Sequence, residues 1–247
     1  LQAIFDGLDI DMHGLDEFLE ESKEINNRFL TEVYFFHDLT HLEEMKALLD
    51  KLTDKHGLSH YALIDYLLYC IAKNNTEKMS ECVQILNEII FFSTLPDRQT
   101  IYHSLSHYEY LLKHYDDAED LIAQADKIYV NNRRHALILS QHGLIKMATG
   151  KLFEAHDLIS QARELFEAEN NFTRSFMCKI NLTEILIAVG KYQEAISAYQ
   201  ELLKLSQPFC ISPIFITRIH LGMLYIYAYQ QNFNSFFDLY NQLNEED

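Results

Sequence analysis

The feature that most constrains this chain is a period of roughly forty residues that runs along most of its length. Six linkers are each followed by an amphipathic segment with an apolar residue at the same place: Met45, Cys82, Ala118, Ala155, Ala195 and Phe236. Successive markers are 37, 36, 37, 40 and 41 residues apart. Such a period is typical of stacked helical hairpins that contact only their neighbours. We therefore expect an elongated array whose curved surface is suited to binding.

The clearest unit of the period covers residues 133–169. Its first helix contains Gly143, and a break at Gly150 precedes a second helix. One face of that second helix carries Ala155, Ile159, Ala162 and Phe166. A Gly in the first helix, a Gly at the turn and the spacing A-x3-(large)-x2-A resemble the tetratricopeptide repeat. Gly143 and Ala155 are expected where the two helices cross closely.

The unit that begins near residue 171 repeats this pattern, and the other four match it more loosely. The expected hairpins are 21–53, 58–92, 97–130, 133–169, 171–206 and 211–245. The fold predicted from them is all-α, a right-handed superhelix of about six tetratricopeptide-like hairpins. Residues 1–20 are expected to be the end of a preceding domain and a linker, and residues 21–247 the repeat domain.

Composition limits the partners of the chain. Asp and Glu number 37 against 20 Lys and Arg, which gives a formal charge of −17. A surface this acidic repels phosphate backbones, so these residues are not expected to bind nucleic acid themselves. The four cysteines form no C-x-x-C pair, which favours a reducing compartment. With no signal-peptide pattern at residues 1–20 and no apolar run of ~18 residues, we expect a cytoplasmic protein.

Residues 1–20 do not follow the period. Leu1, Ile4, Leu8 and Ile10 fit the pattern L-x-x-I-x-x-x-L-x-I. A loop through Gly14 is expected next, and then a separate short helix at 15–19 that contains Asp16-Glu17-Phe18. The segment is similar to the end of a helix-turn-helix domain of the lambda-repressor type, whose DNA-reading helices are absent from this chain.

Such a segment directly before tetratricopeptide-like hairpins resembles the peptide-pheromone regulators of Firmicutes, of the PlcR, Rgg and NprR kind. The resemblance rests on architecture and repeat pattern. It implies a ligand-sensing and dimerisation domain of a transcription regulator, which binds a short signalling peptide in its concave groove for quorum sensing. It also implies a homodimer, and DNA contact only through the missing helix-turn-helix domain.

Two other functions remain open. One is a tetratricopeptide scaffold or co-chaperone that gathers protein partners without any DNA-binding part. The other is an array of the Rap type, which would require an acidic helical bundle before the repeats, and residues 1–20 are too short to form one. An enzyme is not expected, because no nucleotide-binding, zinc-protease or serine-hydrolase motif occurs. No cofactor is expected either.

Three H-x3-H pairs raise the question of a metal site: His37/His41, His56/His60 and His103/His107. Two imidazoles at i, i+4 share a helix face and could hold a metal ion. The first two pairs fall at expected turns, however, and 12 histidines in 247 residues make such spacings common. Structural or surface roles are therefore expected for these histidines.

Candidate peptide-binding residues lie on the first helices, because first helices line the concave side of tetratricopeptide arrays. These residues are Thr100, His103, His107, Gln141, Leu144, Met177, Asn181, Glu184, Arg218 and Tyr225. Gln141 and Asn181 are the preferred clamps, since an amide can pair with both a peptide N–H and a peptide C=O. Arg218 could pair with a peptide carboxylate, and Glu184 with a basic side chain.

The last unit carries many aromatic residues: Phe215, Tyr225, Tyr227, Tyr229, Phe233, Phe236 and Phe237. A hydrophobic pocket or a dimer surface would account for them. Core packing of the last hairpin is the preferred interpretation, because aromatic residues at helical spacing are usually core.

Overall fold

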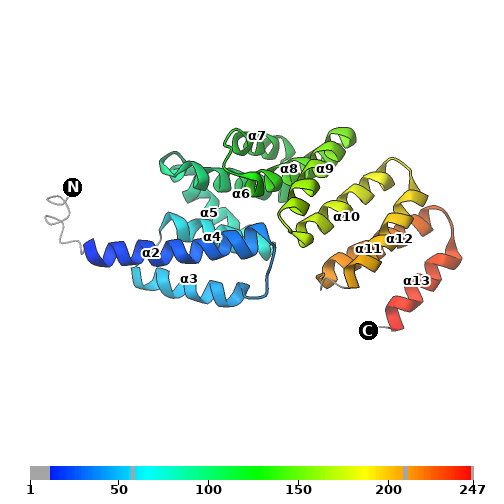
Figure 1. Ribbon diagram of the computed structural model, residues 1–247, viewed down its shortest axis with the longest axis horizontal. Coiled ribbons are helices and arrows are strands. Elements are labelled where there is room, and N and C mark those ends of the chain that lie inside the picture. The colour runs from blue at the N-terminus through cyan, green and yellow to red at the C-terminus, as the bar shows by residue number, and fades with distance from the viewer. Residues whose placement is uncertain (1–11, 57–58, 208–210, 246–247) are drawn as a thin grey trace. The chain divides into compact units, whose positions relative to one another are not determined.

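The computed structural model describes residues 12–56, 59–207 and 211–245, and every regular element in these ranges is a helix (Figure 1). The α-helices are α2 Met12–Arg28, α3 Leu42–His56, α4 His60–Ala72, α5 Thr76–Ile89, α6 Leu95–Leu111, α7 Tyr115–Asp126, α8 Asn132–Ala148, α9 Leu152–Ala168, α10 Phe172–Ala188, α11 Tyr192–Ser206, α12 Pro213–Tyr229 and α13 Phe233–Glu245. They pair in chain order as six hairpins, so the predicted all-α fold of tetratricopeptide-like hairpins is confirmed. None of these helices is both long and apolar enough to cross a membrane.

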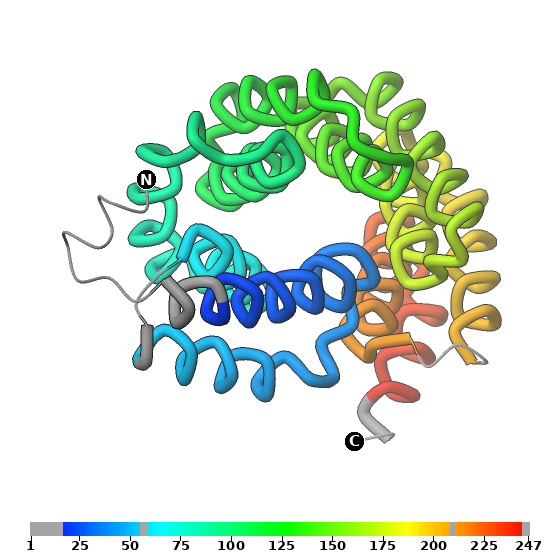
Figure 2. Tube along the Cα trace, turned by 60° about the vertical axis from the view of Figure 1, so that its left-hand side comes forward, coloured from blue at the N-terminus to red at the C-terminus, as the bar shows by residue number. Residues whose placement is uncertain are grey.

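The helices form two compact units, and the boundary between them lies within α8, after Gln141. In the first unit α2 packs against α3 and α4, α4 against α5 and α6, and α6 against α7. The pair α2 and α3 is drawn in blue in Figure 2. In the second unit α9 packs against α10, α10 against α11 and α12, and α12 against α13. First helices therefore contact the first helices of the next hairpin, which gives each unit a continuous first-helix face.

A left-handed residue closes the first helix of every hairpin. The backbone φ is positive at the corresponding turn position of all six: His37, Asn74, Lys113, Gly150, Gly190 and Gln231. At Gly150 the amide donates to Met147 O at 3.1 Å, and the next amide, of Lys151, donates to Lys146 O at 2.9 Å. These two bonds are the Schellman pattern that satisfies the last carbonyls of a helix. Glycine takes a positive φ without a steric cost, whereas the other four residue types do not.

The first hairpin differs from the prediction. Residues 12–28 form one helix, so the separate short helix at 15–19 is wrong. A single glycine near a helix end costs only ~1 kcal/mol, and Phe18, Ser22 and Asn26 keep one buried face in register. The helix continues as the π-helix η1, Phe29–Phe35. The match to a helix-turn-helix domain at residues 1–10 lies outside the described residues, and the division of the chain at residue 20 stays a prediction.

The predicted close crossing of α8 and α9 is confirmed. A Cβ added to Gly143 would lie 2.4 Å from Ile159 Cγ1 and 3.4 Å from Ala155 O. In α6 the corresponding residue is Ser106, which is buried and donates from Oγ to Ala118 O at 2.7 Å. Small side chains at this position thus allow the two helices of a hairpin to approach closely.

The last hairpin is packed less completely than predicted. Phe215 is buried, but more than half of the surface of four aromatic side chains is exposed: Tyr225, Tyr229, Phe233 and Phe237. The core interpretation of the aromatic run is therefore wrong for these four. They recur at helical spacing because α12 and α13 each have an apolar face that the described residues leave uncovered.

Candidate functional site

On the first-helix face of the first unit, three predicted residues of α6 lie together. Thr100, His103 and His107 follow one another by three and four residues, which places them on one side of the helix. Thr100 is buried, and its Oγ1 accepts a hydrogen bond at 2.8 Å from a guanidinium nitrogen of Arg134 on α8. The His103 ring meets the ring of Tyr34 edge to face, with 5.2 Å between centroids.

His107 and Gln141 form the second contact between α6 and α8. His107 Nδ1 lies 3.0 Å from Gln141 Oε1, and because an amide oxygen only accepts, the imidazole N–H is the donor. The Gln141 side chain is buried, and its Nε2 has no hydrogen-bond partner among the described residues. An unpaired buried amide costs ~1–3 kcal/mol. The Gln141 amide thus keeps one buried N–H donor that no described acceptor uses.

A pocket of about 190 Å³ lies on the same side of the first unit, between η1 with the end of α2 and the start of α8. Its wall includes Asn27 and Thr31 on one side and Arg133 and Arg134 on the other. The Arg133 guanidinium lies 5.3 Å from the centroid of the Phe35 ring, a cation–π contact. The first turn of α8 adds its positive dipole end to these two cations. The pocket therefore favours a carboxylate or another anionic group.

In the second unit, three predicted residues form one hydrogen-bonded cluster. Arg218 of α12 donates from Nε to Glu184 Oε1 at 2.7 Å and from a terminal nitrogen to Oε2 at 2.6 Å. A terminal nitrogen also donates to Asn181 Oδ1 at 2.8 Å. Both partners lie on α10, three residues apart. The sequence predicts a peptide carboxylate as the partner of Arg218 and a basic side chain as the partner of Glu184. In the structure these two residues instead neutralise each other's charge.

The other predicted residues lie outside the hydrogen-bonded contacts described above. Tyr225 follows Arg218 by two helical turns, is 56% exposed, and stacks on Tyr229 with 6.2 Å between ring centroids. Leu144 and Met177 are half-buried. The sequence did not single out Arg134 or the pocket residues. The spacing held a usable signal, since Arg134 follows Thr100 by 34 residues, as Gln141 follows His107 and Arg218 follows Glu184.

A buried carboxyl group lies between the first helices of the first two hairpins. Asp65 of α4 is fully buried, and its Oδ1 accepts a hydrogen bond from Asn26 Nδ2 of α2 at 2.7 Å. Its Oδ2 has no hydrogen-bond partner among the described residues. Burial raises the pKa of Asp65 well above its usual value, and the bond from Asn26 opposes this only in part. The contact of α2 with α4 therefore includes an incompletely satisfied acid.

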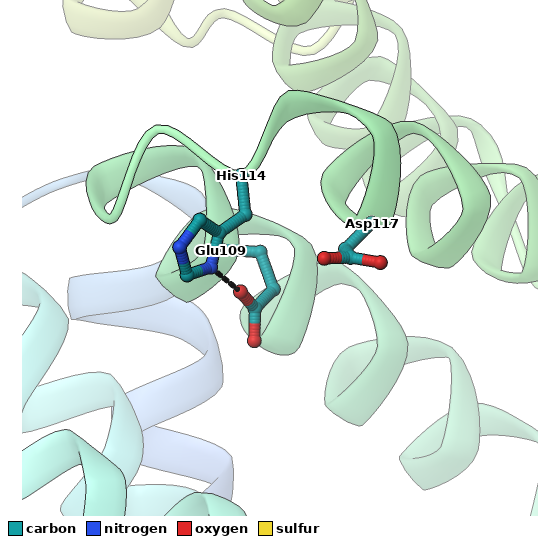
Figure 3. Close-up of side chains that lie close together, drawn as sticks. All are labelled: Glu109, His114 and Asp117. Carbon is teal, nitrogen blue, oxygen red and sulfur yellow. Dashed lines mark hydrogen bonds and ion pairs between the residues drawn. The ribbon is translucent and has the colours of Figure 1, made fainter.

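Of the residues that the structure describes, one group of three could offer metal ligands: Glu109, His114 and Asp117, at the turn from α6 to α7 (Figure 3). His114 Nδ1 donates to Glu109 Oε2 at 2.8 Å. This bond braces the turn, and His114 and Asp117 are exposed. None of the three H-x3-H pairs belongs to the group. His37 lies at a turn, and residues 57–58, between His56 and His60, lie outside the described ranges.

No protein-family model and no curated protein matches the sequence. Solved structures do match. NprR in complex with its cognate peptide NprX superposes with a TM-score of 0.72 at 16% identity, over 92% of this chain and 66% of that one. A Rap protein complexed with competence and sporulation factor gives 0.74 at 13%, over 90% and 65%. A thermophilic tetratricopeptide protein of Thermus thermophilus gives 0.58 at 17%, over 81% and 99%.

At these identities the likeness shows a shared fold. The chain spans about two thirds of the length of the NprR and Rap structures. These structures and this chain share the fold of stacked tetratricopeptide-like hairpins that the sequence predicts.

Proposed function

We propose that this chain is the peptide-sensing part of a cytoplasmic transcription regulator, and that it binds rather than catalyses. A short linear peptide would lie against a first-helix face, by analogy with NprR bound to NprX and Rap bound to competence and sporulation factor. The regulator would act as a homodimer and would contact DNA through a helix-turn-helix domain outside this chain. The exposed aromatic face of α12 and α13 is the candidate dimer surface.

One observation carries this proposal: polar side chains of successive first helices pair with one another at a spacing of 34 residues. The pairs are Thr100–Arg134 and His107–Gln141 in the first unit and Glu184–Arg218 in the second. We call these three contacts the polar ladder. Their donors and acceptors are of the kinds that an extended peptide backbone needs, because its N–H and C=O groups are unpaired. A peptide could therefore exchange hydrogen bonds with the ladder.

The ladder also suggests how binding would be transmitted. Each of its contacts joins two neighbouring hairpins, so a ligand that replaces one changes how these hairpins are held together. A ligand shifts a conformational equilibrium only by its difference in affinity for the two states. A peptide that binds better to one spacing of the first helices would thus shift the array toward it, and would reposition a domain attached to the chain.

Calorimetric titration of the full chain with a library of short linear peptides tests the proposal. For a peptide that binds, Gln141→Ala should weaken the affinity about tenfold, because a buried amide then no longer meets the peptide. Gln161→Ala is the matched control, since Gln161 is exposed on a second helix. Equal peptide affinities of the two variants would contradict the placement of the peptide on the first-helix face.

A scaffold function is the second candidate, because tetratricopeptide proteins outside the sensor group share the fold. The same titration separates the two candidates. A scaffold that recognises folded partners should give no heat with any short peptide, and that result would reject the sensor proposal.

A further inference from the structure

A groove in the second unit lies away from the polar ladder. It has a volume of about 330 Å³ and is formed by α9, α10 and α11. Leu182 and Leu186 of α10 and Leu202 of α11 supply its apolar wall, and Ala198 leaves room between the helices. Sites for small molecules begin at about this volume and are mostly apolar with a few polar groups. The groove is therefore large enough for a small ligand with an apolar body.

One edge of the groove is cationic. Arg163 of α9 and Lys179 of α10 line it. Lys179 is paired with Glu167 at 3.1 Å. Arg163 is only about one third exposed, its Nε is buried without a hydrogen-bond partner among the described residues, and its nearest carboxylate oxygen, on Glu164, is 3.7 Å away. Among the described residues, Arg163 thus has one guanidinium donor, Nε, without an acceptor and only a loose ion pair at a terminal nitrogen.

The repeat period indicates that packing does not require a cation at this position. Lys179 lies eleven residues before the turn glycine Gly190, and Leu139 lies eleven residues before the turn glycine Gly150. Leu139 is buried, whereas Lys179 is half-exposed. An apolar residue occupies this position in one hairpin, whereas in the next one Lys179 pairs with Glu167 at the edge of the groove.

The groove and the ladder lie on different sides of α10. At about 3.6 residues per turn, Leu182 and Leu186 point in nearly one direction. Asn181 and Glu184 of the Arg218 cluster point to roughly the opposite side of the helix. A ligand in the groove would therefore not compete directly with a peptide on the first-helix face.

We propose that this groove is a second ligand site, for a small monocarboxylate with an apolar tail. The carboxylate would pair with the Arg163 guanidinium, which matches it in a bidentate geometry. The tail would lie along the leucines of α10 and α11. Glu201 lies on the α11 rim and would repel a second negative group, so dicarboxylates and phosphate esters are disfavoured.

Octanoate is the probe. Acetate is the control that lacks the apolar tail, and 1-octanol is the control that lacks the negative charge. We expect octanoate to shift the leucine methyl resonances of the groove in spectra of the full chain. Each control compound should bind at least about tenfold more weakly, since each lacks one of the two interactions.

Variants localise the binding. Arg163→Gln should weaken octanoate binding about tenfold, and Ala198→Leu should block it by filling the groove. Lys204→Gln is the matched control, because Lys204 is exposed on α11 and does not line the groove. Unchanged octanoate affinity in Arg163→Gln, or 1-octanol binding as tightly as octanoate, would overturn the proposal.

Discussion

Gly222→Ala tests how tightly the last hairpin is held against the one before it. Gly222 lies in the middle of α12, and a Cβ built there would be 2.6 Å from Cε2 and Oη of Tyr199 and 2.7 Å from its Cζ. Tyr199 is fully buried among Ile219 and Met223 of α12 and the other members of this core. Real Cβ atoms do not approach this closely, so the ring or the helix must move.

The magnitude follows from two opposing terms. Overpacking a well-filled core costs ~1–3 kcal/mol. Alanine recovers ~0.5–1 kcal/mol because glycine is unfavourable inside a helix. The free energy of unfolding should therefore fall by roughly 0.5–2 kcal/mol. The substitution would be neutral or stabilising if the space around Gly222 were open. The sign of the change in the free energy of unfolding therefore distinguishes a tight helix crossing from a loose one.

Urea unfolding followed by far-ultraviolet circular dichroism measures the change. The decisive comparison is a double-mutant cycle with Tyr199→Leu, which removes the ring that the methyl group meets. In that background Gly222→Ala should cost nothing or stabilise, with a coupling energy of about 1 kcal/mol or more. An equal loss in both backgrounds would refute the steric reasoning, as would a Gly222→Ala chain more stable than the unmodified one.

Three further predictions concern a turn, a buried acid and a helix cap. Lys113 has a φ of +64°, so Lys113→Gly should raise the free energy of unfolding by about 0.5–1 kcal/mol in the same urea assay. Asp65 has a pKa above its unfolded-state value, so the folded chain binds more protons between the two, and stability falls as pH rises through this window. Unfolding of Asp65→Asn at a series of pH values should show a smaller fall, and an unchanged slope would reject the assignment. Asn171 Oδ1 accepts the Arg174 amide at 3.1 Å, so Asn171→Ala should cost ~1 kcal/mol of stability, measured by urea unfolding.

Much of the fold could be predicted from the sequence because the repeat fixes two features, the buried small residues of the second helices and the turn between the paired helices. Ala118, Ala155 and Ala195 are fully buried where the period placed them. The turn between the paired helices is fixed by one residue with a positive φ, of which Gly150 and Gly190 are the forms visible in a sequence. The other four turns carry His, Asn, Lys or Gln, and only the period identifies them.

The first and last hairpins were harder to predict for physical reasons. A glycine is a weak helix breaker, so Gly14 could not show whether Met12–Arg28 is one helix or two. The π-helix Phe29–Phe35 shifts the register of its side chains in a way that regular helical periodicity does not anticipate. In the last hairpin, a helix face has the same apolar spacing whether or not a neighbour covers it. The exposure of Tyr225 and Phe237 therefore could not be predicted from the sequence.

For the candidate site, the repeat period predicts which helix each residue belongs to but not which side chain it pairs with. It assigned Gln141, Asn181 and Arg218 to first helices, but it treated each residue as facing a ligand alone. Once positions 34 residues apart are aligned, chemical complementarity becomes visible, because a carboxylate lies opposite a guanidinium and an imidazole opposite an amide. In the proposed function, a peptide on this face would compete with bonds that already join neighbouring hairpins. Its binding energy would then be linked to the stability of the contact between those hairpins.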